Sequence, residues 1–288
     1  MSYDLLISAA QLQDLLANKT PVLIFDGTFD LADATLGHKQ YLDSHIPGAV
    51  YAHLDTALSD KGGTGVSGGR HPLPSREKFA AWLSSVGMTN DMQAVVYDRN
   101  GVNYCGRLWW MLKWAGHASV AVLDGGLQAW QAAGGAVKSG SESPNTPSNF
   151  ALGQSKSVLV ATKTVADNLG RPIQTLIDAR GAPRFRGEVE PLDPIAGHIP
   201  GALNRPFGQN IGADGKFKPA AVLKQEFEAL LAGRDPASVV HHCGSGVSAV
   251  PNILAMQIAG LGNSSTLGLY AGSWSDWCSD ASRPMAQG

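Results

Sequence analysis

The chain has 288 residues, of which 44% are hydrophobic and 16% charged, and its formal net charge is -2. This composition is typical of a soluble globular protein with room for one large or two ordinary domains. A balance of 22 Lys and Arg against 24 Asp and Glu excludes the basic field that nucleic-acid binding needs. We therefore expect a small molecule or a neutral protein surface as the partner, and no nucleic acid.

The first residues, MSYDLLISAAQLQDLL, contain no basic segment, and Asp4 and Gln11 interrupt their apolar run. This pattern favours neither a secretory signal nor a membrane span. The three cysteines are an odd number and too few for a disulfide framework, which favours free thiols in a reducing compartment. The sequence therefore predicts a cytoplasmic protein with no membrane association.

In chain order, the motifs of the first half return in the second half. The β-branched run VLIFD ends at Asp26 and the run TLID ends at Asp178, and both predict buried strands. HIPGAV, which starts at His45, returns as HIPGAL, which starts at His198. SREKFAAWLSSVG and EFEALLAG predict amphipathic helices that stop at a glycine. A repeated order of motifs indicates a duplicated structural unit.

The repeat continues through a loop whose central residue differs between the halves. AVVYDRNGVNY aligns with VVHHCGSGVSA, so that Asp98 falls opposite Cys243 and Gly101 opposite Gly246. LDGGLQAW then aligns with LYAGSWSDW. Alternating strands and helices predict an α/β fold with two tandem domains, each a mainly parallel sheet flanked by helices.

Composition sets the expected boundaries of these domains. The segment 141–157 is rich in Ser, Pro, Asn and Gly and is interpreted as a linker between domains at 1–140 and 158–288. Residues 59–75, SDKGGTGVSGGRHPLPS, form a second loose segment. Loops of that length in compact domains are often functional, so this one could reach the site.

The loop that starts at Cys243 carries the strongest chemical signal. Ligands of open α/β sheets bind beyond the carboxyl ends of the strands, where the predicted strand 239–242 delivers this cysteine. Gly244 and Gly246 let successive N–H groups turn inward, and a helix that starts in VSAVPNILAMQIAG, with Pro251 in its first turn, adds its dipole. Because thiols ionise readily in such settings, we expect a thiolate here. The sequence from residue 236 to 275 contains no Asp, Glu, Lys or Arg, so backbone dipoles are expected to supply the positive character.

Other readings of the cysteines and histidines are less specific. Cys105 and Cys278 are interpreted as small buried hydrophobic residues. His241 and His242 raise the possibility of a metal, but adjacent strand residues face opposite sides and no zinc-ligand spacing accompanies them.

A phosphatase that uses a thiolate in an amide cradle needs an arginine where this chain has Ala249. A sulfurtransferase that forms a persulfide is therefore favoured.

The tandem HIPGA motifs, the GGL-x-x-W segment and the CGSGVSA loop resemble the rhodanese superfamily over nearly the whole chain. The loop is similar to that of 3-mercaptopyruvate sulfurtransferases. The resemblance implies a catalytically silent first domain, with Asp98 where the thiol would be. It also implies that Cys243 takes a sulfur atom from 3-mercaptopyruvate as a persulfide and passes it to a thiol acceptor such as thioredoxin, or to cyanide. No metal or organic cofactor is implied.

The resemblance also assigns roles to residues outside the loop. The family's serine falls on Ser245, and its partners fall on His71 and Asp55, which implies a relay that moves or polarises the donor's thiol proton. The loop residues Gly244, Gly246, Val247 and Ser248 are expected to contact the donor.

Carboxylate recognition in the family uses two arginines. The first falls on Arg184, shortly after the strand end Asp178-Ala179-Arg180. A guanidinium suits this role because it offers a planar fork to the carboxylate of an α-keto acid. The second has no match, because Leu192 stands in its place, and this departure leaves thiosulfate open as the donor. Arg186 is the candidate substitute.

Residues at equivalent positions in both halves are assigned to structure, since one half is expected to be silent. These are Asp26, Asp178, Arg180 and the two HIPGA histidines, His45 and His198. Trp274 and Trp277 either wall the pocket or pack in the core. The alternative to an enzyme is a non-catalytic rhodanese-like binding module, which the intact cysteine loop disfavours.

Overall fold

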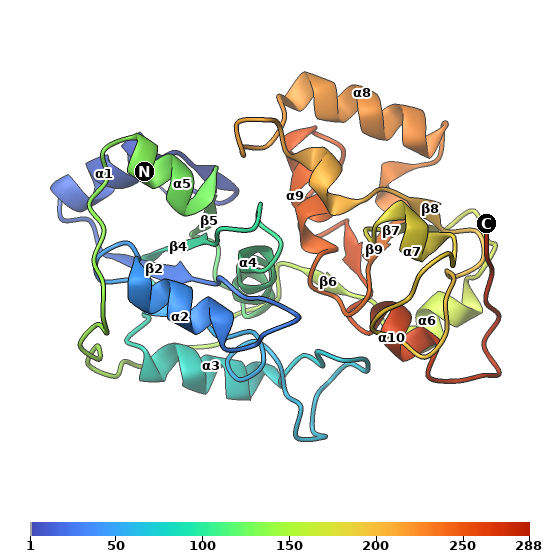
Figure 1. Cartoon of the computed structure of the whole chain (residues 1–288), viewed down its shortest axis with the longest axis horizontal. Helices are drawn as coiled ribbons and strands as arrows, with labels where there is room; N and C mark the ends of the chain where they lie inside the picture. The colour runs from blue at the N-terminus through green and yellow to red at the C-terminus, as the bar shows by residue number, and fades with distance from the viewer. Residues whose placement is uncertain (1) are drawn as a thin grey trace. The chain divides into compact units, whose positions relative to one another are not determined.

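The computed structural model describes residues 2–288, which form two compact units (Figure 1). Unit 1 contains the residues up to Ser59, residues 74–156 and residues 212–217. Unit 2 contains residues 60–73, 157–211 and 218–288. The segment expected as a linker, 141–157, packs along unit 1 as far as Lys156, for example through a hydrogen bond from Ser148 N–H to the Ser84 carbonyl.

Unit 1 is a five-stranded sheet with helices around it. Its strands are β1 (Leu6–Ile7), β2 (Val22–Asp26), β3 (Val50–Tyr51), β4 (Gln93–Tyr97) and β5 (Val120–Leu123). Its helices are α1 (Ala9–Ala17), α2 (Leu36–Asp43), α3 (Arg76–Ser85), α4 (Cys105–Trp114) and α5 (Gly126–Ala132). The strand order is β1-β5-β4-β2-β3, and every pairing is parallel.

Unit 2 repeats this arrangement. Its strands are β6 (Val158–Leu159), β7 (Thr175–Asp178), β8 (Leu203–Asn204), β9 (Val239–His242) and β10 (Gly268–Leu269). Its helices are α6 (Thr162–Asp167), α7 (Ala182–Phe185), α8 (Ala220–Leu231), α9 (Val250–Ile258) and α10 (Ser273–Trp277), with short 3₁₀ turns η1 (Phe207–Asn210) and η2 (Pro236–Ser238). The order β6-β10-β9-β7-β8 is that of unit 1, which confirms the predicted pair of α/β domains with parallel sheets.

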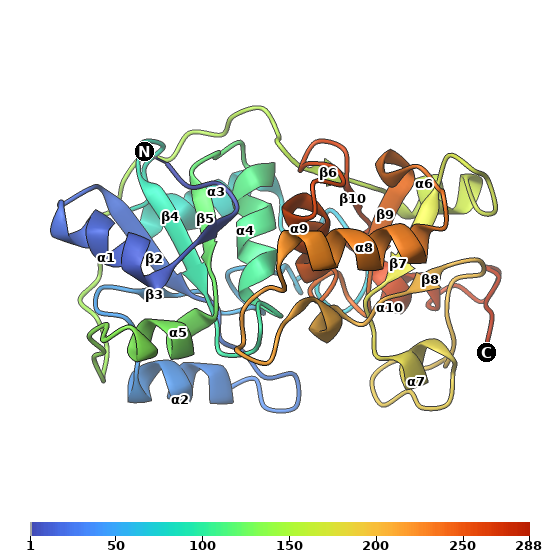
Figure 2. The same ribbon diagram turned by 90° about the horizontal axis from the view of Figure 1, so that it is seen from above.

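The position of β9 explains why the cysteine loop lies at a sheet edge. β9 lies between β10 and β7, and it pairs in register with β7 from Thr175 opposite Val239 to Asp178 opposite His242. Because these strands are parallel, their carboxyl ends meet at one edge, from which the loop after His242 emerges. Helix α9 packs beside α8 and against β9 (Figure 2).

The expected helices form, with one shift of boundary. In α3, Phe79 and Leu83 are fully buried, as the amphipathic pattern predicts. Helix α9 begins at Val250, three residues later than the sequence suggested, and Pro251 stands in its first turn. The three preceding residues stay in the loop and keep their N–H groups out of helical bonds.

The apolar core of unit 2 decides the role of its two C-terminal tryptophans. Trp274 and Trp277 are both fully buried and belong to a cluster with Val165, Ile199 and Tyr270. Their indole N–H groups donate to main-chain carbonyls, those of Ile195 and Pro284. They are therefore core residues. Among residues 2–288, no helix is long and apolar enough to cross a membrane.

Candidate active site

The loop after β9 is held in place by the start of α10. The Cys243 N–H donates to the Ser273 hydroxyl at 3.0 Å, and the Trp274 N–H donates to the Cys243 carbonyl at 3.0 Å. The Ser275 N–H donates to the Gly244 carbonyl at 2.9 Å. These bonds fix the backbone of the nucleophile candidate, and Cys243 itself is only 2% exposed.

Ser273 is a site residue that the sequence analysis did not find. It has a φ of 57°, in the left-handed region, and it is fully buried. Its hydroxyl accepts from the Cys243 N–H and donates to the Tyr270 carbonyl at 2.9 Å. A non-glycine residue in this region is strained and persists where the surrounding contacts hold it, and here the hydroxyl links the end of β10 to the loop. The repeat could have indicated this residue, because Ser273 at the start of α10 corresponds to Gly126 at the start of α5, which has a φ of 59°.

The loop backbone provides a group of uncommitted donors. In the part of the chain that the structure describes, five N–H groups after Cys243 donate to no protein acceptor; they belong to Gly244, Ser245, Val247, Ser248 and Ala249. All of these residues except Ser248 are buried. Buried N–H groups are nearly always paired with some acceptor, so this loop is suited to a negatively charged group.

The equivalent loop of unit 1 shows what such a backbone binds. The two carboxylate oxygens of Asp98 accept four N–H bonds, from Asn100, Val102, Tyr104 and Cys105, at 2.8 to 3.0 Å. The aspartate, which replaces the cysteine, is thus an internal anion that fills the ring of amides. The internal carboxylate thus occupies these four N–H donors. That the first domain is catalytically silent stays a prediction.

The structure brings Ser245 and His71 together. The Ser245 hydroxyl and the His71 Nδ1 are 2.8 Å apart, and both residues are buried. The segment 60–73 carries His71 to this point, because unit 2 includes it and the Arg70 N–H donates to the Ser275 hydroxyl at 3.1 Å. The loose segment of the sequence therefore does reach the cysteine loop.

Asp55 and Arg186 lie in different units. Asp55 belongs to unit 1, where its N–H donates to His53 Nδ1 at 3.1 Å. Arg186 has a 43% exposed side chain and forms a two-bond ion pair with Glu188.

Arg184 lies at the loop, and a second arginine that the sequence analysis missed lies beside it. A Cβ placed on Gly244 would lie 2.9 Å from Nη2 of Arg70 and 3.6 Å from both Nη atoms of Arg184. The expectation that the positive character comes from backbone dipoles alone is therefore wrong. The sequence near the cysteine holds no cation, but the fold brings two guanidinium groups from distant segments over the residue that follows it.

Buried carboxylates hold these arginines. Asp193 pairs with Nη1 of Arg70 through one oxygen and with Nη2 of Arg184 through the other, at 3.2 Å in the latter case. Glu190 pairs with Arg184 at 2.6 Å and with Arg180 at 3.3 Å. Burial opposes ionisation of Glu190, but hydrogen bonds from Arg184 hold the pKa of its carboxyl below the usual value.

The residues assigned to structure have structural contacts. Arg180 forms a buried ion pair with Asp178 at 2.7 Å and lies 4.9 Å from the Trp274 ring centroid. The Nδ1 atoms of His45 and His198 each contact a main-chain carbonyl, at 2.7 and 2.8 Å. The same contact recurs in both units.

His241 and His242 are fully buried on β9, and burial lowers the pKa of both, to about 3 for His241. Each is therefore neutral in the folded protein, whereas an unfolded histidine takes up a proton below about pH 6.5. Stability should fall as pH drops from about 6.5 to about 3, by about 1.4 kcal/mol per pH unit for His241, and His242 should act in the same direction. Urea unfolding measured between pH 7 and pH 4 checks this. His241→Leu should flatten the dependence, and an unchanged slope in that variant would contradict the assignment.

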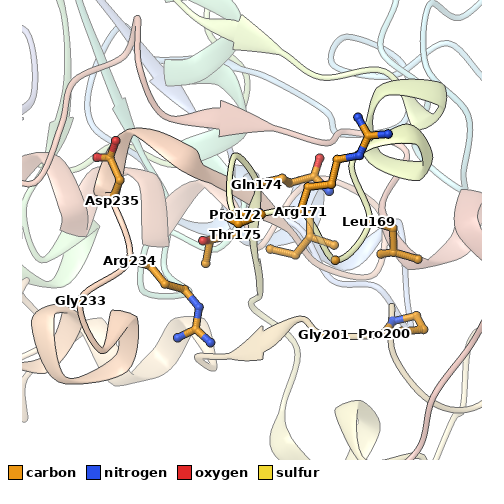
Figure 3. Close-up of a pocket in the computed structure, with 12 residues that line it drawn as sticks. Leu169, Arg171, Pro172, Gln174, Thr175, Pro200, Gly201, Gly233, Arg234 and Asp235 are labelled. Carbon is orange, nitrogen blue, oxygen red and sulfur yellow. The ribbon is translucent and has the colours of Figure 1, made fainter.

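A cavity of unit 2 lies at the opposite edge of its sheet. It has a volume of about 550 Å³ and is lined by Arg171, Gln174, Thr175 and Arg234 among others (Figure 3). Thr175 is the first residue of β7, so this cavity lies at the amino ends of the strands. It is separate from the cysteine loop.

Comparison with known proteins shows the family of the chain. The family description "Rhodanese-like domain" matches residues 8–133 and 161–280. A Pseudomonas aeruginosa protein named "Probable 3-mercaptopyruvate sulfurtransferase" is 45% identical over 289 residues, covering all of both chains. The mitochondrial "Thiosulfate/3-mercaptopyruvate sulfurtransferase 1" of Arabidopsis thaliana is 33% identical over 269 residues, covering 86% of this chain and 69% of that one.

Solved structures agree. The Escherichia coli protein described with the rhodanese fold and the catalytic mechanism of 3-mercaptopyruvate sulfotransferases has a TM-score of 0.77 and 30% identity, covering 95% of this chain and all of that one. The chain therefore belongs to the rhodanese-like family, with two copies of the domain.

Proposed function

We propose that this chain is a sulfurtransferase that takes sulfur from 3-mercaptopyruvate onto Cys243. The observation that carries the proposal is the cysteine at the centre of a loop whose amides are uncommitted, with Arg184 over the next residue. Relatives named for this donor, at up to 45% identity, support it. The amides favour negative charge on either sulfur of a persulfide, and the guanidinium suits the donor's carboxylate.

The proposed first step forms one bond and breaks another. The Cys243 thiolate attacks the donor's sulfur, the sulfur–carbon bond breaks, and its electron pair leaves on the methylene carbon as the enolate of pyruvate. Protonation of that carbon completes pyruvate. The hydrogen-bonded pair of Ser245 and His71 is placed to carry the proton that the donor's thiol gives up. Asp55 completes this relay in the proposal.

The second step regenerates the Cys243 thiolate. A thiol acceptor such as thioredoxin, or cyanide in an assay, attacks the outer sulfur, and Cys243 leaves as a thiolate. All three cysteines are free thiols in the structure, which supports a reducing, cytoplasmic location. Of the donor-binding candidates, Val247 and Ser248 contribute through their N–H groups, and Gly244 and Gly246 through their lack of a side chain.

A second candidate donor is thiosulfate. Leu192 occupies the position expected for an arginine, and the Arabidopsis relative is named for both donors. Thiocyanate formation with each donor decides between them, and a mass spectrum of the loop peptide after donor treatment should show the gain of one sulfur atom. If the loop peptide gains a sulfur atom with thiosulfate but not with 3-mercaptopyruvate, the proposed donor is overturned.

Ser245→Ala should slow turnover of 3-mercaptopyruvate by about 10- to 100-fold, because it removes the hydroxyl that moves the donor's thiol proton. Thiosulfate carries no such proton, so turnover of thiosulfate by the same variant should change by less than about threefold. Steady-state kcat with the two donors measures the difference. Equal losses with both donors would contradict a proton-transfer role and indicate that the hydroxyl only shapes the loop.

A further inference from the structure

β6 is the outermost strand of the unit 2 sheet, and part of its backbone has no partner. Within residues 2–288, β6 has a neighbouring strand on one side only, and that strand is β10 (Figure 2). Leu159 lies opposite Leu269 in the register, and the Val160 N–H donates to the Leu269 carbonyl at 2.9 Å. Because successive residues of a strand direct their N–H and carbonyl groups to opposite sides, those of Leu159 point away from β10.

Three main-chain groups form a row on this outer side of β6. In the part of the chain that the structure describes, the N–H and carbonyl of Leu159 and the N–H of Ala161 have no protein partner. Leu159 is half-buried and Ala161 is exposed, so another chain has access to the row. The alternation of donor, acceptor and donor is the pattern with which an edge strand accepts a further strand.

A cavity of about 470 Å³ lies beside the row. One wall consists of residues 159–162, and another consists of residues 65–68. Val66 brings an apolar side chain to this cavity, and 49% of the residue is exposed. The volume is in the range of binding pockets, and the row offers main-chain hydrogen bonds to an extended peptide placed there.

The segment that walls the cavity continues to the cysteine loop. A Cβ on Gly69 would lie 2.5 Å from the Gly272 carbonyl oxygen, so the segment packs tightly on the start of α10. Two residues later, His71 Nδ1 lies 2.8 Å from the Ser245 hydroxyl. The cavity and the cysteine loop therefore share one wall.

The row also directs an added strand toward Cys243. Leu159 and His241 both lie opposite Leu269, so the row is about 10 Å from β9, which is two strand spacings. β6 and β9 both run parallel to β10, and Cys243 follows the carboxyl end of β9. A peptide that leaves the row at the carboxyl end of β6 therefore emerges at the edge of the sheet that carries the cysteine.

The chemistry of the row favours a protein over a small thiol as its partner. A small thiol has no series of main-chain groups with which to satisfy Leu159 and Ala161, whereas an extended protein segment has one. Strand addition takes its affinity from main-chain hydrogen bonds and its specificity from side-chain contacts, which Val66 provides here.

We propose that the outer side of β6 and the cavity beside it form the docking site of a protein that accepts the sulfur. An extended segment of this protein pairs with Leu159 and Ala161, and a thiol next to that segment reaches Cys243. The acceptor's thiolate attacks the outer sulfur of the Cys243 persulfide, the sulfur–sulfur bond breaks, and its electron pair returns to Cys243. The outer sulfur stays on the acceptor as a persulfide. This inference rests on the proposed function for the persulfide, but strand docking does not depend on it.

Ala161→Pro removes one donor of the row at little cost to the fold. The φ of Ala161 is -77°, which is close to that of proline, and its N–H makes no bond to the described residues. Ala161→Ser keeps the N–H and is the matched control. Val66→Asp is a second variant, which places a charge at the apolar contact instead of removing a donor.

Turnover is measured with 3-mercaptopyruvate as donor and with either reduced thioredoxin or cyanide as acceptor. Ala161→Pro and Val66→Asp should each raise KM for thioredoxin about three- to tenfold, as expected for one lost main-chain hydrogen bond or contact, and should leave turnover with cyanide within about twofold. Ala161→Ser should leave both unchanged. An unchanged KM for thioredoxin in Ala161→Pro, or equal losses with thioredoxin and cyanide, would overturn the inference.

Hydrogen exchange separates docking from the reaction. Without any sulfur donor, saturating reduced thioredoxin should slow amide exchange at Leu159 and Ala161, because N–H groups that pair in a sheet are protected. Slowed exchange in a protein that transfers no sulfur from either donor would support the docking site and remove only the proposed reaction. Unchanged exchange at these two amides would overturn the docking site, whether or not sulfur reaches thioredoxin.

Discussion

Cys243→Ser should abolish sulfur transfer, with turnover falling by at least about 10⁴-fold with either donor. A serine hydroxyl is barely ionised at neutral pH, and an oxygen–sulfur bond does not provide the persulfide that an acceptor can attack. The loop should remain folded, because the hydrogen bonds that fix residue 243 use its main-chain N–H and carbonyl groups. Thiocyanate release and the mass of the loop peptide after donor treatment measure the loss.

The other two cysteines supply the controls. Burial raises the pKa of the Cys105 thiol well above its usual value, with the nearby Asp98 carboxylate adding to the effect, and burial raises that of Cys278. Both thiols therefore stay protonated and unreactive. Cys105→Ala and Cys278→Ala should keep turnover within about threefold of the unmodified protein. Persulfide on either residue, or turnover by Cys243→Ser near that of the unmodified protein, would remove Cys243 from its role.

Gly246→Ala should be the most damaging small substitution in the loop. Gly246 has a φ of 72°, and a Cβ there would lie 2.2 Å from the Ala271 carbonyl oxygen. The methyl group meets backbone rather than a flexible side chain, so the loop or the turn after β10 must move. We expect a loss of about 3 kcal/mol or more in the free energy of unfolding. Turnover should fall about 100-fold, since small displacements of a reacting group are costly.

A substitution at Gly260 is the control that separates the cost of the backbone conformation from the cost of the steric clash. Its φ is also 72°, but a Cβ there would meet nothing within 4 Å. Gly260→Ala should therefore cost only about 1–2 kcal/mol, the ordinary penalty for a left-handed residue with a side chain, and should keep its activity. Urea unfolding and steady-state kinetics on both variants provide the comparison. Equal effects of the two substitutions would show that contact with Ala271 does not shape the loop.

The sequence by itself determined the duplicated fold and the central residue of the site. Strands such as VLIFD and helices such as SREKFAAWLSSVG are local patterns, because burial and helix periodicity are set by neighbouring residues. The alignment of the two halves then placed Asp98 opposite Cys243, and the glycine at position 246 indicated a turn that requires a positive φ. The family resemblance added His71 and Ser245, which lie 2.8 Å apart in unit 2.

Only the tertiary structure decided what surrounds the cysteine. Arg70 lies far from Cys243 in sequence, and no local pattern indicates that Asp193 would hold it beside Arg184 over Gly244. Ser273 supports the Cys243 N–H only because β10 pairs with β9 and brings the start of α10 to the loop. Sequence patterns report which residues are buried and where the chain turns. The charges and donors that meet at a sheet edge depend on strand order and crossovers, which place segments from distant parts of the chain together.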